Sequence, residues 1–290
     1  MDMPPAEWNV KPLQAAILNV FREFEKICER HGLRYFAIGG TALGAIRHQG
    51  FIPWDDDMDV AMPREDYNRF VGIANKELPA QLRFCRGGDG VLSSIYFGRV
   101  VDVSDGIVER LRLETNLDLT FPPFLDVFVL EGLPESVNDV KKWWLGHRLI
   151  RICQTYRYPE NTVKGSACNS FRSYLSFWIC KVAGFVLSWF YPTTRNSEEM
   201  MKLFDDYFMR WPYDSAHVVV EPAFFKFKTS RIFPRCVFEP AKKMPFEAGE
   251  INVPSKVEVY LSQYFGDYMK LPPPEYRIPE HAFKRAYNHA

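Results

Sequence analysis

The feature that most limits what this chain can fold into is the segment 39–60, GGTALGAIRHQGFIPWDDDMDV, in which a glycine pair precedes a dense run of carboxylates. The apolar residues 35–38 before it predict a short buried strand, and the apolar residues 60–62 end a second strand. Between the strands we expect a turn at the glycines and a short helix that starts near Thr41, whose hydroxyl suits the N-cap position. The segment therefore predicts that a glycine turn and a carboxylate-bearing strand belong to one structural unit.

Asp57 and Asp59 are two positions apart on this expected strand, so their side chains project from one face with Cα atoms roughly 6–7 Å apart. Aspartate is disfavoured in strands and like charges repel, so a cation between the two carboxylates would stabilise the pair. Hard oxygen ligands of this kind suit Mg²⁺ or Mn²⁺ that is shared with substrate phosphates. A solvated loop is the other interpretation of the acidic run 55–59.

A two-metal site needs a third acid, and Asp126 is the candidate. It interrupts the apolar strand 124–129, where an unpaired charge would be costly. The alternative is a core acid that is paired with an arginine. Either way, a carboxylate in this strand predicts a specific partner.

The glycine pair Gly39-Gly40 follows a strand and opens a helix, so backbone N–H groups there can approach a phosphate closely. Glycines before a helix are common, and this signal gains weight only from the acidic pair that follows. Arg47 and His48 are further candidates for phosphate contacts, although a surface role suits His48 equally well. Trp54 is either a core residue below the acidic loop or part of the site.

Helical patterns flank this segment. Apolar residues recur with helical spacing over 13–30, and Gly32 follows in the cap region. Pro63 suits the first turn of a further helix, and residues 138–210 form a helical half that looks distinct from the first.

Two features lie in the second half. In the tail, Ser255 and Glu258 have the spacing of a capping box for a helix over 255–265. The apolar stretch 174–191 is almost as long as a membrane span, but Lys181 near its centre favours a buried or groove-forming helix. A membrane-facing helix is the alternative.

Charge and cysteine usage narrow the class of protein. The 36 basic residues balance 36 acidic ones, without the basic excess that is typical of duplex-binding proteins, which argues against nucleic acid as a partner. The six cysteines form no Cys-x-x-Cys pair and the start of the chain shows no signal-peptide pattern, so we expect a cytoplasmic protein with cysteines as small core residues. The six histidines show no zinc-ligand spacing.

The segment 39–60 resembles the signature of the LicD family, the phosphocholine transferases, which shares its core with the fukutin-related proteins. The strand around Asp126, with Glu131-Gly132 after it, resembles the second acidic motif of the family. The tail 264–273 and then His281 resemble its C-terminal end, whereas the middle of the chain, about 138–209, carries no match. The positions that match in the first motif are Gly39-Gly40-Thr41, Leu43-Gly44, Arg47, Gly50-Phe51-Ile52-Pro53-Trp54 and Asp55-Asp56-Asp57-Met58-Asp59.

The resemblance implies an α+β, nucleotidyltransferase-like fold, which is a small mixed sheet flanked by helices with an additional helical region. It divides the chain into a catalytic core over 1–135, a helical region over 136–217 that faces the acceptor or the membrane, and a part over 218–290 that packs back on the core. It also implies a set of site residues. These are Asp57, Asp59 and Asp126 as catalytic metal ligands for Mg²⁺ or Mn²⁺, and Gly39, Gly40, Thr41 and Arg47 as donor-binding residues.

The implied reaction is transfer of phosphocholine from CDP-choline to a hydroxyl of a surface glycan precursor, such as lipopolysaccharide or teichoic acid, with release of CMP. The acceptor is a glycan or a lipid-linked glycan, so the expected location is cytoplasmic, with peripheral contact to the inner face of the membrane kept open. A choline headgroup would be recognised by an aromatic cage. The aromatic candidates are Trp54, Tyr96, Trp143, Trp144 and Tyr156.

Three alternatives remain at this point. The same site could use another CDP-activated donor, carrying phosphoethanolamine or a polyol phosphate. A true nucleotidyltransferase would transfer the nucleoside monophosphate instead. A non-catalytic protein would use its acids only to bind a metal or to solvate a loop.

Overall fold

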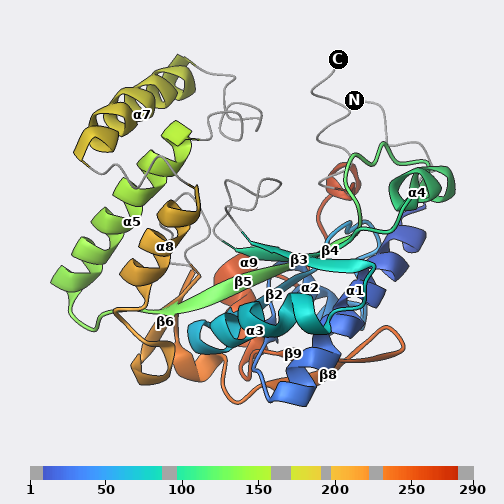
Figure 1. Cartoon of the computed structure of the whole chain (residues 1–290). Helices are drawn as coiled ribbons and strands as arrows, with labels where there is room; N and C mark the ends of the chain where they lie inside the picture. The colour runs from blue at the N-terminus through green and yellow to red at the C-terminus, as the bar shows by residue number, and fades with distance from the viewer. Residues whose placement is uncertain (1–8, 87–96, 158–170, 191–196, 222–230, 280–290) are drawn as a thin grey trace. The chain divides into compact units, whose positions relative to one another are not determined.

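The computed structural model describes residues 9–86, 97–157, 171–190, 197–221 and 231–279 of the 290-residue chain. They form a mixed α+β fold with a mixed sheet and flanking helices, as the resemblance implies (Figure 1). The helices are α1 (Lys11–His31), α2 (Gly39–Arg47), α3 (Arg64–Glu77), α4 (Ile107–Thr115), α5 (Val137–Arg157), α7 (Phe171–Phe190), α8 (Ser197–Phe208) and α9 (Val257–Phe265).

The main sheet has the strand order β1-β2-β5-β4-β3, so that β2 and β5 are neighbours although α3, β3, β4 and α4 separate them in sequence. The first two strands are antiparallel, with Phe36 opposite Ala61. A separate antiparallel pair is formed by β8 and β9. The strands are β1 (Phe36–Ala37), β2 (Asp59–Pro63), β3 (Leu82–Arg86), β4 (Gly98–Asp102), β5 (Phe124–Gly132), β6 (Val218–Val220), β7 (Ile232–Pro234), β8 (Lys242–Phe246) and β9 (Gly249–Val253).

The described residues fall into two compact units. The first contains those of Met1–Phe84, Arg99–Val129 and Phe233–Ala290, and the second contains those of Cys85–Gly98 and Leu130–Ile232. All the residues that the sequence singles out as catalytic, metal-binding or donor-binding lie in the first unit.

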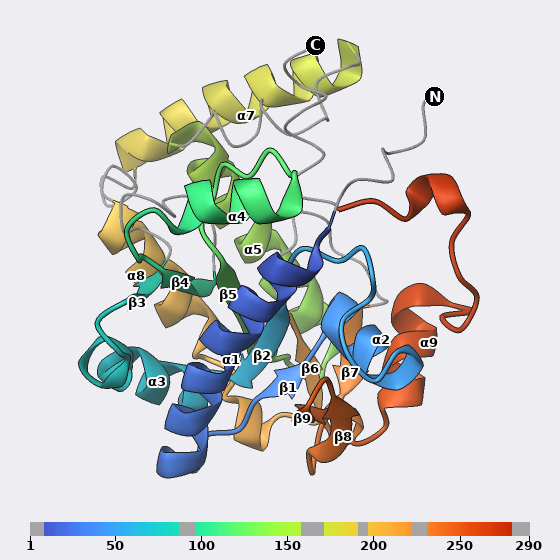
Figure 2. The ribbon, with the colours of Figure 1, turned by 90° about the vertical axis from the view of Figure 1, so that its right-hand side faces the viewer.

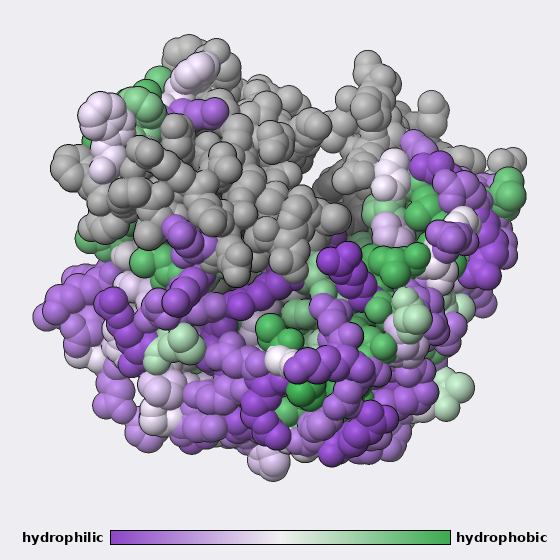
Figure 3. All heavy atoms as spheres, viewed as in Figure 1, coloured by the Kyte–Doolittle hydropathy of each residue, from purple (hydrophilic) through white to green (hydrophobic). Residues whose placement is uncertain are grey.

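The core of the first unit is formed by apolar side chains that the helical and strand periodicities predict. Helix α1 begins at Lys11 and ends at His31, and Gly32 caps it in the left-handed conformation with φ 59°, which confirms the predicted helix and its stop. Its buried face includes Phe24, whose ring packs edge-on against those of Tyr35 and Phe70, 5.5 and 5.0 Å away between centroids. In the view of Figure 3 most of the coloured surface is hydrophilic, with smaller hydrophobic patches between.

Helix α2 carries the glycine pair and lies beside the C-terminal helix α9 (Figure 2). It begins at Gly39 with Ile38 at the N-cap, so the predicted start near Thr41 is wrong by two residues. The reason is tertiary, because the Thr41 hydroxyl accepts a hydrogen bond from the backbone N–H of Asp59 at 2.8 Å instead of capping its own helix.

The predicted capping box at the start of α9 does not form. Lys256 occupies the N-cap position without a side-chain hydrogen bond to the helix. The chain is held there by backbone N–H groups of Ser255 and Lys256, which donate to the carbonyls of Phe238 and Val237. Glu258 instead lies 3.9 Å from the ammonium of Lys242. Backbone contacts with the 3₁₀ turn Arg235–Val237 and the residue after it therefore fix this helix start.

The second unit has its own apolar core, built from α5, α8 and β6. Within the described part of the chain, none of the helices combines the length and apolar character that crossing a bilayer demands. Helix α7, which covers the stretch 174–191 up to Phe190, differs from the expected buried helix because it exposes many apolar side chains. The exposed ones are Leu175, Trp178, Ile179, Val182, Phe185, Val186 and Trp189. The core residues are Leu133, Trp143, Met201, Phe204, Phe208 and Val220.

Candidate active site

The site is organised around the N-terminus of α2, where β1 ends at Ala37 and the chain turns at the glycine pair. Gly39 has a φ of 53°, in the left-handed region that side chains disfavour. A Cβ at Gly39 would lie 3.2 Å from Oδ2 of Asp59, and a Cβ at Gly40 would lie 2.8 Å from Oδ2 of Asp55. The two glycines thus make room for two carboxylates directly against the helix start, which is the positive end of the helix dipole.

The predicted strand with Asp57 and Asp59 starts later than expected. Strand β2 begins at Asp59, and Asp57 lies just before it in the connecting loop. The backbone of Asp59 is fixed at both polar groups, because its N–H donates to Thr41 and its carbonyl accepts from the N–H of Ile38 at 3.2 Å. Thr41 therefore positions an acid of the site.

Asp126 lies beside this segment, as the backbone N–H of Asp126 donates to the carbonyl of Met58 at 3.0 Å. Its buried carboxylate is paired with Arg99, whose Nε donates to Oδ1 and whose Nη2 donates to Oδ2 at 2.9 Å. The Arg99 guanidinium also stacks over the Phe124 ring, with 3.8 Å from Cζ to the centroid. Asp126 is thus a core acid paired with an arginine, which was the alternative interpretation of the sequence, and Arg99 is the partner.

Arg99 also connects the three predicted aspartates. Burial lowers the pKa of its guanidinium, but the charge and hydrogen bonds of Asp126, and then the charges of Asp59 and Asp57, outweigh this effect and raise it. The three carboxylates, which come from β2, the loop before it and β5, therefore all interact with the positive charge of Arg99. We had no sequence signal for Arg99, because its partner is 27 residues away in a different strand.

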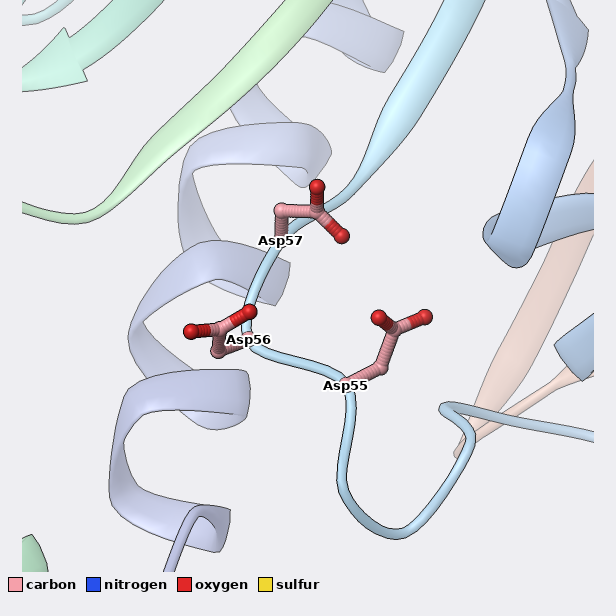
Figure 4. A group of neighbouring side chains, drawn as sticks. All are labelled: Asp55, Asp56 and Asp57. Carbon is pink, nitrogen blue, oxygen red and sulfur yellow. The ribbon is translucent and has the colours of Figure 1, made fainter. Parts of the chain in front are cut away.

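The acidic run itself forms a second grouping. Asp55, Asp56 and Asp57 each offer a carboxylate oxygen, and these oxygens lie within 4.8 Å of one another. Figure 4 shows that the carboxylates of Asp55 and Asp57 extend to the same side of the loop, whereas that of Asp56 points the other way. Asp56 is buried with 0% of its surface exposed, and Gln14 donates to the carbonyls of Ile52 and Asp55, so the run is not the fully solvated loop of the alternative interpretation.

These residues fit a divalent cation. The donors are carboxylate oxygens, which are the ligands that Mg²⁺ and Mn²⁺ prefer. The Arg99 guanidinium shows that the arrangement of Asp57, Asp59 and Asp126 already stabilises a positive charge at this place. Asp55 was missing from the predicted ligand set, although its place in the acidic run and its contact with Gly40 make it a further candidate.

A basic and aromatic group lies at the other end of α2. Arg47, in the last turn, donates through Nη1 to the carbonyl of Tyr268 at 2.8 Å. Trp54 meets the His48 ring edge-on at 6.4 Å and lies under the Arg277 guanidinium at 5.7 Å. Trp54 is therefore a neighbour of the donor-binding candidate Arg47 rather than a core residue alone.

The other aromatic candidates for a headgroup cage do not join this group. Trp143 is 1% exposed and belongs to the core of the second unit, and Trp144 packs against that core. Tyr96 and His281 lie outside the described residues, and so does the side chain of Tyr156.

Comparison with known proteins gives the site a family context. Residues 32–106 match the family described as LicD/FKTN/FKRP, nucleotidyltransferase domain. The chain is 29% identical over 281 residues to the lipopolysaccharide cholinephosphotransferase LicD of Haemophilus influenzae, across 94% of this chain and 96% of that protein. It is 27% identical over 154 residues to the ribitol 5-phosphate transferase FKRP of Homo sapiens, across 53% of this chain and 27% of that protein.

Proposed function

We propose that this chain, a phosphotransferase of the LicD family, transfers phosphocholine from CDP-choline to a hydroxyl of a cell-surface glycan or its precursor and releases CMP. The chain belongs to that family, because its residues 32–106 match the nucleotidyltransferase domain and its likeness to the bacterial cholinephosphotransferase runs over 94% of its length. That relative's name supports phosphocholine as the group transferred and lipopolysaccharide as the class of acceptor.

One structural observation carries the proposal. The backbone N–H of Asp126 donates to the carbonyl of Met58, the residue between Asp57 and Asp59, and the Asp126 carboxylate pairs with Arg99. This group lies beside a glycine turn that opens a helix. Transfer of a substituted phosphate requires neutralisation of negative charge on the donor and a route for the acceptor proton. Carboxylates that hold cations next to backbone N–H groups meet the first requirement.

In the proposed mechanism Asp57, Asp59 and Asp126 would hold Mg²⁺ or Mn²⁺, with Asp55 close to Asp57. The bound cation would neutralise the charge that develops on the leaving CMP. The backbone N–H of Gly40, at the positive end of α2, would contact donor phosphate. The N–H of Gly39 already donates to the Tyr260 hydroxyl at 2.9 Å, so Gly39 would serve by letting the phosphate approach closely. Asp126 would accept the proton of the acceptor hydroxyl through lone pairs that Arg99 leaves unused.

The experiment that tests the proposal is incubation with a lipopolysaccharide acceptor and a panel of CDP-linked donors, with acceptor-dependent CMP release as the readout. We expect CMP from CDP-choline in Mg²⁺ or Mn²⁺ and none in EDTA. Asp57→Asn and Asp59→Asn should each lower the rate by about a hundredfold or more, because even groups that only orient metal ligands are worth roughly 10- to 100-fold. Asp139→Asn is the matched control, since this exposed acid on α5 pairs with Lys142. Full activity of the site variants would remove the proposed catalytic role.

A second candidate donor is a CDP-linked polyol phosphate. The observation that favours it is the match to a ribitol 5-phosphate transferase over 53% of this chain. The same panel separates the two, because CMP release with CDP-ribitol and none with CDP-choline would assign the polyol reaction. Release of pyrophosphate from a nucleoside triphosphate would instead assign nucleotidyl transfer.

We further infer that the reaction takes place in the cytoplasm, at the inner face of the membrane, and that α7 contacts the lipid surface. Trp189 and Val182 are 71% and 61% exposed on that helix, and aromatic and apolar side chains of this kind favour the interface of a bilayer. In a liposome flotation assay, Trp189→Ser should bind less than the unmodified chain. Leu113→Ser on α4, which removes an 84% exposed side chain, is the control that should leave binding unchanged.

A further inference from the structure

We propose that Arg47 and Arg277 together form a binding site for the phosphate groups of the nucleotide half of the donor. The inference rests on the proposed function only for the identity of that donor, a nucleoside diphosphate. It adds a residue of the C-terminal tail, Arg277, that neither the sequence pattern nor the comparisons single out.

Arg47 makes one short hydrogen bond and one longer contact at the end of α2. Its Nη1 donates to the Tyr268 carbonyl at 2.8 Å, and its Nε lies 3.5 Å from Nδ1 of His48. These contacts orient the guanidinium but bring no negative charge to it. The burial of this side chain lowers its pKa, and so does the nearby Arg277, while Asp55 acts in the opposite direction.

Arg277 approaches the same place from the tail, directly after the 3₁₀ turn Pro274–Tyr276. Its Nε donates to the carbonyl of Pro272 at 2.9 Å, and its guanidinium lies over the Trp54 ring. Trp54 in turn meets His48, the neighbour of Arg47. The two arginines, which are distant in sequence, therefore flank one histidine–tryptophan contact.

This arrangement is unusual within the first unit because two like charges lie close together. Among the described residues, no carboxylate forms an ion pair with either Arg47 or Arg277. Other arginines of the unit do have such partners: Arg22 pairs with Glu25, Arg34 with Asp66 and Arg99 with Asp126. Two guanidinium groups that repel each other and keep free donor positions are suited to an anion, and their planar forks match phosphate oxygens.

The position of Arg47 and Arg277 indicates which part of the donor they bind. Asp55 lies against Gly40 at the start of α2, and its negative charge also raises the pKa of Arg47. Asp55 is therefore a neighbour of both the glycine turn and the arginine pair. The arginines would therefore extend the proposed phosphate-binding region from the glycine turn towards the C-terminal tail. A choline headgroup is positively charged and would be repelled by both arginines. The pair consequently belongs to the nucleotide side of the pyrophosphate.

The test is a ³¹P NMR titration of inorganic pyrophosphate with the full chain in EDTA, which removes any contribution from metal. We expect Arg277→Gln and Arg47→Gln each to weaken binding by about tenfold or more, the usual value of a hydrogen bond to a charged group. Arg235→Gln is the matched control, because that arginine pairs with Glu239 at 3.2 Å and should leave pyrophosphate binding unchanged. Arg277→Lys keeps the charge without the fork, so it should retain part of the affinity.

A structural role of Arg277 predicts a different result. Glutamine can still donate to the Pro272 carbonyl, so Arg277→Gln should keep the thermal midpoint of the unmodified chain. If the lysine and glutamine variants bind pyrophosphate equally, or if Arg277→Gln binds as tightly as the control, the phosphate site is refuted. Pyrophosphate contains neither nucleoside nor choline. Suppose that the glutamine variants lose pyrophosphate binding but the unmodified chain does not turn over CDP-choline. That result would support the phosphate site and refute only the proposed reaction.

Discussion

Replacing Arg99 with methionine tests whether the aspartates around it form a cation site. The side chain of Asp126 is only 5% exposed, and the substitution removes both hydrogen bonds that Arg99 donates to it. Removal of one partner of a buried ion pair costs about 3–5 kcal/mol, because the other charge stays buried without compensation. Arg99 itself is 22% exposed, so we expect the lower end, about 3 kcal/mol of unfolding free energy in EDTA.

A divalent cation should reverse much of this loss. A ligand that binds only the folded state at a concentration of 100 times its Kd stabilises by about 2.7 kcal/mol. In Arg99→Met the cation replaces the missing positive charge, whereas in the unmodified chain it competes with the guanidinium. We therefore expect Mg²⁺ or Mn²⁺ to raise the urea midpoint of Arg99→Met more than that of the unmodified chain.

The control is Arg110→Met, which removes an exposed arginine that lies 3.9 Å from Glu114 on α4. Surface pairs of this kind are worth about 0–1 kcal/mol, so its urea midpoint should change little and should respond to metal as that of the unmodified chain does. Equal losses for Arg99→Met in EDTA and in saturating Mg²⁺ would show that the three aspartates hold no cation beside Arg99. That result would refute the reasoning.

Three other predictions follow from single contacts. Gly40→Ala places a Cβ 2.8 Å from Oδ2 of Asp55. It should lower the rate of CMP release by roughly tenfold to a hundredfold, because small displacements of reacting groups have effects of this size. An unchanged rate would contradict the placement of this carboxylate. Gly72→Ala in α3, where a Cβ meets nothing within 4 Å, should stabilise by about 0.5–1 kcal/mol in thermal unfolding. The pKa of the Tyr35 phenol is raised above its usual value of about 10, first by burial and then by the hydrogen bond to Glu25. Just above pH 10 the folded chain therefore keeps this proton, whereas the unfolded chain loses it. Stability should thus fall as the pH rises above about 10, and urea midpoints of Tyr35→Phe should lack this part of the decrease.

The local features of the fold were predictable because they depend on near neighbours in sequence. Helix α1 with its glycine stop, the strand before the glycine pair and the apolar strand around Asp126 all carry their own periodicity. The starts of α2 and α9 were mispredicted because distant backbone groups decide them. Thr41 bonds to Asp59, and the residues before α9 bond to Val237 and Phe238.

The sequence singles out only part of the candidate site. Carboxylates in strands are unfavourable, and this made Asp57, Asp59 and Asp126 visible in the sequence. The roles of these three, and of Gly39, Gly40, Thr41 and Arg47, remain predictions. Arg99 and Arg277 gave no signal, because an arginine is compatible with most surfaces and its partner is set by strand order and by the path of the tail.

The charge of the whole chain conceals this arrangement. Equal numbers of basic and acidic residues suggest a surface without strong fields, yet the acidic run interacts with two different arginines. Asp57 and Asp59 act on Arg99, whereas Asp55 acts on Arg47 and faces the glycine turn. A reaction that joins an anionic donor to metal cations needs both signs of charge within a few ångströms, because each stabilises the other when water is displaced. Formal neutrality is therefore compatible with phosphate chemistry at a site whose opposite charges are arranged locally.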